Sequence, residues 1–295
     1  MATTIDPEFA SWAVGQLAPG GTFVGARGLR AGGAPWLVTA RTQAGNELEG
    51  VLRVGPVGDT DDIRVEAASL RYVSSKGLPA PVVLGMRAGT DPALLLIERV
   101  SGRSDIPLER PTGRLRTLGA FAARLSQLDA PAGFPPRTRS IAGVDFDALR
   151  REAEPQPLLQ QAEAIVAAGV PEGRVGVVHG DLWQGNALWD DDELVAIIDW
   201  DCSGVGPAGI DLGSLRMDAA LCFGGGAEAD VLDGWRGAAG VPSDLAYWDL
   251  TAALSTPPTL AWFVEATRAQ GRPDLNRPLM LARRDEFLRA ALDAV

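Results

Sequence analysis

The sequence predicts an α+β fold in which a strand-rich first part is followed by a mainly helical second part. Short β-rich apolar runs bounded by turn residues recur through the first hundred residues. Beyond residue 110, apolar residues instead recur at helical spacing. The chain has 295 residues, of which 46% are hydrophobic. This length and composition suit one two-lobed unit, or two domains, with a sizeable core.

The first part is predicted to contain five strands, a short leading helix and one longer helix. The leading helix covers residues 5–17 and ends before Pro19. The longer helix opens at Asp61 and stops at Gly77, with apolar residues at helical spacing between them. The five strand-like runs cover residues 22–28, 35–42, 48–54, 82–87 and 93–98.

The second part is predicted to be helical around a short central strand. An apolar stripe from Leu115 to Leu128 marks an amphipathic, core-facing helix. Residues 130–142 contain three prolines and are expected to form a loop. The strand over 175–178 would deliver His179. The remaining helices are expected at residues 145–154, 156–168, 211–222, 228–239, 244–269 and 276–293.

One stretch carries most of the chemical information. Residues 177–201 read VVHGDLWQGNALWDDDELVAIIDWD. Asp181 and Asn186 lie five positions apart, so a short loop can direct a carboxylate at an incoming hydroxyl while the amide behind it faces a metal ion. The spacing is therefore that of a phosphoryl-transfer loop.

A hairpin after this loop would return a second acid to the same place. Residues 187–189 and 194–198 are predicted strands joined by a turn. The hairpin would bring Asp199 back beside Asn186. One neutral and one anionic oxygen ligand are what Mg²⁺ commonly takes from a protein when waters and phosphate oxygens complete its octahedron.

The segment HGDLWQGNALW, followed by IIDWD and GIDLGSL, resembles the aminoglycoside phosphotransferase branch of kinase-like small-molecule phosphotransferases. The resemblance spans most of the chain. It implies a two-lobed protein-kinase-like fold, with a small antiparallel-sheet N-lobe carrying one helix and a larger, mainly helical C-lobe. The expected division is 1–98 for the nucleotide-binding lobe, 99–102 for the hinge and 103–295 for the catalytic and acceptor-binding lobe. Gly180 and the lack of an Ala-Pro-Glu segment make a protein kinase a poor match.

The resemblance also implies a role for each motif residue. Asp181 would be the catalytic base for the acceptor hydroxyl, and Asn186 and Asp199 would hold Mg²⁺. His179 is the only histidine of the chain and would fix the loop by hydrogen bonding, which excludes a histidine-based metal cluster. Asp211 would cap a helix and brace the loop.

On the nucleotide side, Gly32 and Gly33 form a hairpin tip where backbone N–H groups could approach phosphates. Better-known members carry lysine on the third strand, whereas the sole lysine here, Lys76, falls at a helix end. Arg53 is the expected replacement, because a guanidinium stays charged and can hold phosphate oxygens through two parallel hydrogen bonds.

The same resemblance places three further residues around the nucleotide. Glu66, on the long helix of the first part, is expected to pair with Arg53 and orient it toward the phosphates. A surface carboxylate is the competing interpretation of Glu66. The backbone N–H and C=O groups of Glu98 and Val100 are expected to contact the adenine edge.

The net charge of −11 is concentrated in the second part of the chain. Residues 1–100 hold nine basic against ten acidic residues, whereas residues 101–295 hold 18 against 28. This argues against a nucleic-acid partner, whose phosphates need a basic surface. The acidity would steer a cationic small molecule, or it is ordinary solubility charge.

The last helices carry aromatic and acidic residues that could line an acceptor pocket. Periodicity alone does not separate that role from core tryptophan and surface acid. These residues are Trp235, Trp248, Trp262, Phe263, Asp218, Asp244, Asp249 and Glu265.

Localisation is predicted to be cytoplasmic, without membrane association. No run of eighteen apolar residues occurs, and the N-terminus carries acids where a signal peptide would carry Lys or Arg. The two cysteines, Cys202 and Cys222, cannot build a disulfide framework.

Together these features predict Mg²⁺-dependent transfer of the γ-phosphate of ATP or GTP to a hydroxyl of a small molecule, with an aminoglycoside or another antibiotic among the acceptors and antibiotic resistance as one role. The alternatives are a metabolite kinase acting on choline, homoserine or an amino sugar, and a nucleotide-binding pseudokinase. A metal-dependent hydrolase is disfavoured because it would lack histidine ligands.

Overall fold

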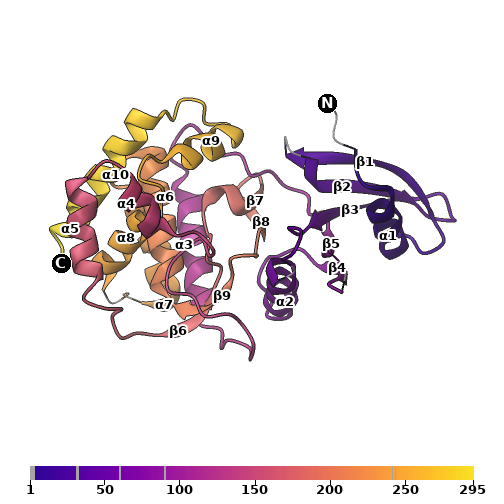
Figure 1. Ribbon diagram of the computed structural model, residues 1–295, viewed down its shortest axis with the longest axis horizontal. Helices are drawn as coiled ribbons and strands as arrows, with labels where there is room; N and C mark the ends of the chain where they lie inside the picture. The colour runs from indigo at the N-terminus through magenta and orange to yellow at the C-terminus, as the bar shows by residue number, and fades with distance from the viewer. Residues whose placement is uncertain (1–3, 31–32, 60, 90, 241, 243) are drawn as a thin grey trace. The chain divides into compact units, whose positions relative to one another are not determined.

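The computed structural model describes residues 4–30, 33–59, 61–89, 91–240, 242 and 244–295 (Figure 1). The chain divides into two compact units. The first comprises Met1–Ser101 together with Val195–Asp201, and the second comprises Gly102–Leu194 together with Cys202–Val295. The first unit thus includes a segment from late in the chain, whereas the division expected from sequence assigned residues 195–201 to the second part.

The first unit is a five-stranded antiparallel sheet with two helices, as the sequence predicts (Figure 1). The strand order is β1-β2-β3-β5-β4, so only β5 is inserted out of chain order. The elements are α1 (Pro7–Leu17), β1 (Thr22–Arg30), β2 (Gly33–Arg41), β3 (Glu47–Val54), α2 (Asp61–Ser75), β4 (Val83–Arg87) and β5 (Leu94–Glu98).

The two faces of strand β3 contact different parts of the first unit. Leu52 is fully buried in a cluster with Ala13 of α1 and with Leu94 and Leu96 of β5. Successive side chains of a strand point to opposite faces of the sheet. Arg53 therefore leaves the sheet on the other face, where it meets α2.

The second unit is mainly helical, and its elements are α3 (Thr112–Ser126), α4 (Phe146–Glu152), α5 (Pro157–Val166), β6 (Val175–Val178), the 3₁₀ turn η1 (Gln184–Asn186), β7 (Ala187–Asp190), β9 (Gly204–Pro207), α6 (Gly209–Phe223), α7 (Ala227–Ala239), α8 (Leu245–Leu254), α9 (Ala261–Ala269) and α10 (Arg277–Leu292). Strand β8 (Glu193–Ile197) forms a two-stranded sheet with β7 and runs on into the first unit. No helix of the described part of the chain is long and apolar enough to cross a membrane.

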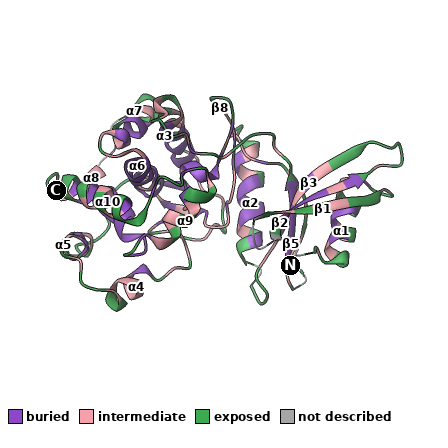
Figure 2. Ribbon diagram, turned by 90° about the horizontal axis from the view of Figure 1, so that it is seen from above, coloured by how far each residue is buried: buried purple, intermediate pink, exposed green. Residues whose placement is uncertain are grey.

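Helix α6 forms the core of the second unit. Thirteen of its fifteen residues are buried, and the helix is purple along its length in Figure 2. Such a helix is surrounded on all sides, so its polar residues need partners inside the protein. Arg216 finds one in Asp249 of α8, through two hydrogen bonds of 2.8 Å each.

One sequence expectation is wrong in this unit, and one strand was not predicted. The single helix expected over residues 244–269 is divided into α8 and α9. Pro257 and Pro258 lie between them, and proline has no N–H to continue a helix. Strand β9 was not predicted; it pairs antiparallel with β6, from Val175 opposite Pro207 to Val178 opposite Gly204.

Candidate active site

The loop after β6 is held by a buried carboxylate. Asp211 of α6 accepts hydrogen bonds from the backbone N–H groups of His179 at 2.7 Å and Gly180 at 2.9 Å. Burial raises the pKa of Asp211, while the interactions with His179 and Gly180 oppose that rise. The predicted brace is confirmed. The predicted cap is wrong, because Ala208 occupies the N-cap position of α6.

Local contacts fix the rest of this loop. The backbone N–H of Asp181 donates to Nδ1 of His179 at 3.2 Å. Gly180 has a φ of 80°, and a Cβ there would collide with the carbonyl oxygen of Cys202, so only glycine fits. His179 is fully buried. The predicted structural role of this histidine is confirmed.

Asp181 and Asn186 come together as their spacing predicts. Turn η1 places the Asn186 side chain so that its Nδ2 donates to the backbone oxygen of Asp181 at 2.9 Å and to Asp181 Oδ2 at 3.2 Å. The atom of this amide that would ligate a cation is therefore Oδ1. Both residues belong to the second unit.

In the first unit, one guanidinium contacts three carboxylates. Arg53 Nε lies 2.7 Å from Glu66 Oε2, Nη1 lies 2.6 Å from Asp199 Oδ1, and Nη2 lies 3.0 Å from Asp201 Oδ2. We call these four residues the Arg53 cluster. The predicted pair between Arg53 and Glu66 is confirmed, and Glu66 is not a surface carboxylate, because it is only 1% exposed.

Asp201 is a member of this cluster that sequence reasoning missed. It lies two positions after Asp199 in the segment IIDWD, and this short separation is the sequence feature that could have identified Asp201. Asp199 itself has a φ of 69°, a left-handed conformation that non-glycine residues seldom adopt and that often marks functional sites.

Burial and charge act against each other within the Arg53 cluster. Burial raises the pKa of Glu66 from its ordinary value of 4.5 to about 8, although the charge of Arg53 lowers it. Burial alone would lower the pKa of Arg53, but Glu66, Asp199 and Asp201 together raise it. Three carboxylates share one cation, so the fully ionised cluster has an excess of negative charge.

The other residues predicted to contact the nucleotide lie in the glycine pair and at the end of β5. Gly32 lies outside the described residues, and Gly33 opens β2, where it pairs with Arg30. Glu98 ends β5 and its N–H donates to the Val82 oxygen at 2.8 Å, so that N–H belongs to the sheet. Val100 follows β5 in irregular backbone. Lys76 lies over the ring of Tyr72 at 5.2 Å, outside the Arg53 cluster.

The second unit contains a pocket of about 160 Å³ with Asp181 in its wall, which we call the Asp181 pocket. Its wall also includes Ile141, Met217, Asp218, Trp262 and Phe263. The helical spacing of Asp218, Trp262 and Phe263 does not distinguish a pocket role from a core or surface role. In the structure all three line this pocket. Trp235 and Trp248 are buried in the core.

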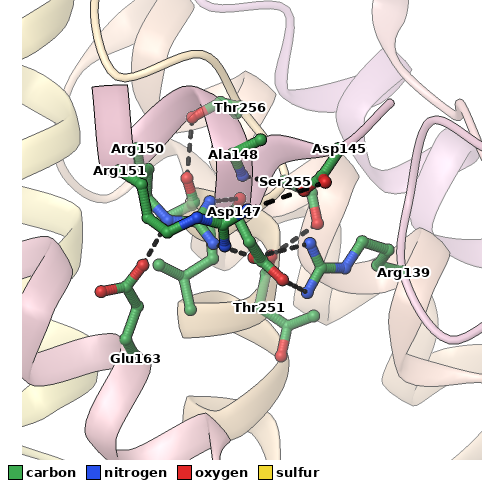
Figure 3. Close-up of polar contacts among 12 residues, drawn as sticks. Arg139, Asp145, Asp147, Ala148, Arg150, Arg151, Glu163, Thr251, Ser255 and Thr256 are labelled. Atoms are coloured by element: carbon green, nitrogen blue, oxygen red, sulfur yellow. Dashed lines mark hydrogen bonds and ion pairs between the residues drawn. The ribbon is translucent and has the colours of Figure 1, made fainter. Parts of the chain in front are cut away.

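Figure 3 shows a network of charged residues next in sequence to two pocket-lining serines, Ser140 and Ser255. Arg150 of α4 bonds to Asp147, to Glu163 of α5 and to the backbone oxygen of Leu254 at the end of α8. Arg139 adds a contact of 3.0 Å to Asp147. The next residues along the chain, Ser140 after Arg139 and Ser255 after Leu254, line the pocket. The network therefore ties two segments of the pocket wall to α4 and α5.

Comparisons with a family model and with solved structures both find phosphotransferases. The model of the family described as "Phosphotransferase enzyme family" matches residues 36–248. An aminoglycoside-3'-phosphotransferase of type VIII has a similar structure, with 25% identity, a TM-score of 0.57, and coverage of 79% of this chain and 93% of that one. No curated protein matches the chain.

Two further solved structures bear on the fold alone, because their identities are lower. Amicoumacin kinase hAmiN, in complex with AMP-PNP, Ca²⁺ and Ami, has 19% identity and a TM-score of 0.60, covering 99% of this chain and 94% of that one. Macrolide 2'-phosphotransferase MphH from Brachybacterium faecium has 22% identity and a TM-score of 0.58, covering 94% of each chain. The chain thus has the two-lobed, kinase-like α+β fold that its sequence predicts.

Proposed function

Because the chain belongs to the phosphotransferase enzyme family, we propose that it transfers the γ-phosphate of ATP or GTP, with Mg²⁺, to a hydroxyl of a small molecule. The observation that carries the proposal is the position of Asp181. Its carboxylate stands on a braced loop and lines a pocket of about 160 Å³, where an acceptor hydroxyl could reach it.

In this mechanism Asp181 acts as the base. The acceptor hydroxyl gives its proton to the Asp181 carboxylate as the new oxygen–phosphorus bond forms. The bond between the γ-phosphorus and the bridging oxygen breaks, and the nucleotide leaves as a diphosphate. The bond from Asn186 Nδ2 to Asp181 Oδ2, at 3.2 Å, orients the carboxylate, so most of the rate would come from positioning.

The residues present fit a hard divalent cation. Carboxylate oxygens and an amide oxygen are its preferred ligands, and the excess negative charge of the Arg53 cluster favours a cation. We assign Asn186 and Asp199 to hold Mg²⁺, which when bound would neutralise charge on the transferring phosphate.

Arg53 is assigned to the phosphates. Its Nε stays on the buried Glu66, which orients the guanidinium, and its two Nη groups are the donors that would contact phosphate oxygens. We assign the adenine edge to the carbonyl oxygen of Glu98 and the N–H of Val100, because the N–H of Glu98 bonds within the sheet. Gly32 and Gly33 would cover the phosphates.

The test is nucleotide turnover with Mg²⁺, measured by coupled release of ADP or GDP against a panel of small hydroxyl compounds. Asp181→Asn should lower acceptor-dependent turnover by about 10²- to 10⁴-fold, the usual contribution of a general base. Asp190→Asn, the same change at an exposed residue of β7, serves as the matched control and should leave the rate unchanged. Wild-type turnover in Asp181→Asn would refute the proposal.

A further inference from the structure

We infer that the acceptor presents one ring-sized apolar or aromatic group beside its reacting hydroxyl, and no array of ammonium groups. The inference rests on the proposed function, since it describes what the Asp181 pocket would admit during that reaction. It departs from the cationic acceptor that the acidic second part of the sequence suggested.

The size of the pocket limits how much of the acceptor it encloses. Its volume is about 160 Å³. An apolar cavity of roughly 150 Å³ binds a benzene molecule, whereas pockets for drug-sized ligands start near 300 Å³. The second unit therefore encloses about one ring, and the remainder of a larger acceptor would lie outside this pocket.

The walls of the pocket favour an apolar ring. Met217 of α6 and Phe263 of α9 line it, and a thioether adapts readily to an aromatic neighbour. Trp262 also lines the pocket yet is 48% exposed. The centroid of its ring lies 6.3 Å from that of Phe146, with an angle of 51° between the two ring planes. A half-exposed indole at a pocket is a suitable surface for stacking.

The charge of the pocket does not suit a polycation. Asp218 Oδ2 accepts from the backbone N–H of Gln184 at 3.2 Å and from its Nε2 at 2.8 Å, and Cys222 Sγ lies 3.6 Å from Oδ1. Burial raises the pKa of Asp218, whereas the hydrogen bonds from Gln184 oppose that rise, and these bonds occupy Oδ2. Asp181 is thus the carboxylate that would meet the acceptor, and each additional buried ammonium would need a counterion of its own.

Four hydroxyl side chains line the pocket, and two of them, Ser255 and Thr256, donate to backbone oxygens. Ser255 Oγ donates to the Thr251 oxygen at 2.8 Å, and Thr256 Oγ1 donates to the Ala253 oxygen at 2.7 Å. Hydroxyls used in this way present less hydrogen-bonding capacity to a ligand. Shape and apolar contact are therefore the main sources of selectivity here.

Two strained residues keep the wall in position. Ile141 has a φ of 56°, a conformation that is exceptional for a β-branched residue, and its N–H donates to the Gly180 oxygen at 2.6 Å. Leu260, with a φ of 52°, is the N-cap residue of α9, the helix that carries Trp262. Such strain persists where the surroundings over-determine the backbone, so the pocket should not widen easily to admit a larger polar group.

The experiment measures binding to the whole protein, separately from turnover. Saturation-transfer NMR and titration would compare two neutral ring alcohols, 2-phenylethanol and cyclohexylmethanol, with the polycation kanamycin. The ring alcohols should bind, and Trp262→Ala should weaken that binding about tenfold, as loss of an aromatic contact does. Trp262→Phe should recover most of the affinity. Leu279→Ala, which truncates a similarly exposed residue of α10, should change nothing.

Turnover then separates the two proposals. If the ring alcohols bind at Trp262 but no acceptor is phosphorylated, the proposed function fails and the pocket assignment stands. If kanamycin is phosphorylated and its KM is unchanged in Trp262→Ala, the function stands and the inference is overturned. Failure of both ring alcohols to bind also overturns the inference.

Discussion

Arg53 Nη1 lies 2.6 Å from Asp199 Oδ1, although the two residues are 146 positions apart in the chain. This contact joins the residue assigned to the nucleotide phosphates to a residue assigned to the metal. If Asp199 were to hold a cation, Nη1 of Arg53 would become available to a phosphate oxygen. The arrangement keeps both charged groups satisfied before the nucleotide arrives.

Arg53→Lys should reduce kcat/KM for the nucleotide by at least about tenfold. A lysine ammonium is a compact point charge on a flexible stem, so it cannot reproduce the three-sided contacts of the guanidinium. Steady-state kinetics at fixed acceptor concentration would measure the loss. Arg41→Lys, a matched change in an exposed pair with Glu47 at 2.7 Å, should be silent. Equal effects of the two variants would contradict the assignment of Arg53.

The contribution of Glu66 to the stability of the nucleotide-free protein should fall as pH rises from about 4.5 to about 8. The pKa of Glu66 is raised from 4.5 to about 8 by burial, so the folded protein keeps a proton that the unfolded chain releases. The contribution of Glu66 is complete below the lower value and is lost as pH rises through the higher one. Urea unfolding at a series of pH values would measure this slope.

Glu66→Gln is the control for that pH dependence, because glutamine cannot titrate. The slope between these pH values should become shallower in the variant. A wild-type slope in Glu66→Gln would mean that other groups cause the pH dependence.

Asp211→Ala should lower the free energy of unfolding by about 3–5 kcal/mol, because hydrogen bonds to a charged group contribute about 1.5–3 kcal/mol each and the donors are left buried. The lost bonds are those from the backbone N–H groups of His179 and Gly180. Denaturant unfolding would measure the change. Asp211→Asn keeps an acceptor oxygen and should cost less; identical costs for the two variants would argue against the brace.

The buried pair of Arg216 and Asp249 should behave asymmetrically under mutation. Removal of either partner alone leaves a buried charge and should cost about 3–5 kcal/mol of stability. Replacement of both, as Arg216→Met with Asp249→Leu, should cost far less, because no unpaired charge remains. A double-mutant cycle in urea would measure the coupling. Additive costs would show that the pair contributes little.

The sequence predicted helices and strands correctly where short runs of neighbouring residues define them. The five strands of the first unit and helix α2 follow from apolar runs between turn residues, and the structure contains them. The prediction was wrong over residues 244–269, where the continuous apolar pattern concealed the break at Pro257 and Pro258. That break contributes to the Asp181 pocket, because Ser255 and Thr256 lie between α8 and α9 and line it.

The geometry of the loop over residues 179–186 was predictable because its contacts are local in sequence. Asp181, Asn186 and His179 lie within eight residues, so their spacing already constrains their geometry. The pair of Arg53 and Glu66, thirteen positions apart, came from the family resemblance. Two contacts could be found only in the tertiary structure, because each joins segments that are distant in the chain. They are the contact of Asp201 with Arg53 and that of Asp218 with Gln184.

Which aromatic residues line the Asp181 pocket also depended on the tertiary structure. A helical pattern shows that one face of α9 is apolar, but it does not say which element covers that face. Folding places Trp262 and Phe263 beside Asp181, while Trp235 and Trp248 enter the core. The spacing of residues thus predicted the proposed chemistry, whereas only the packing of distant helices determines the shape of the Asp181 pocket, because that shape depends on which elements meet.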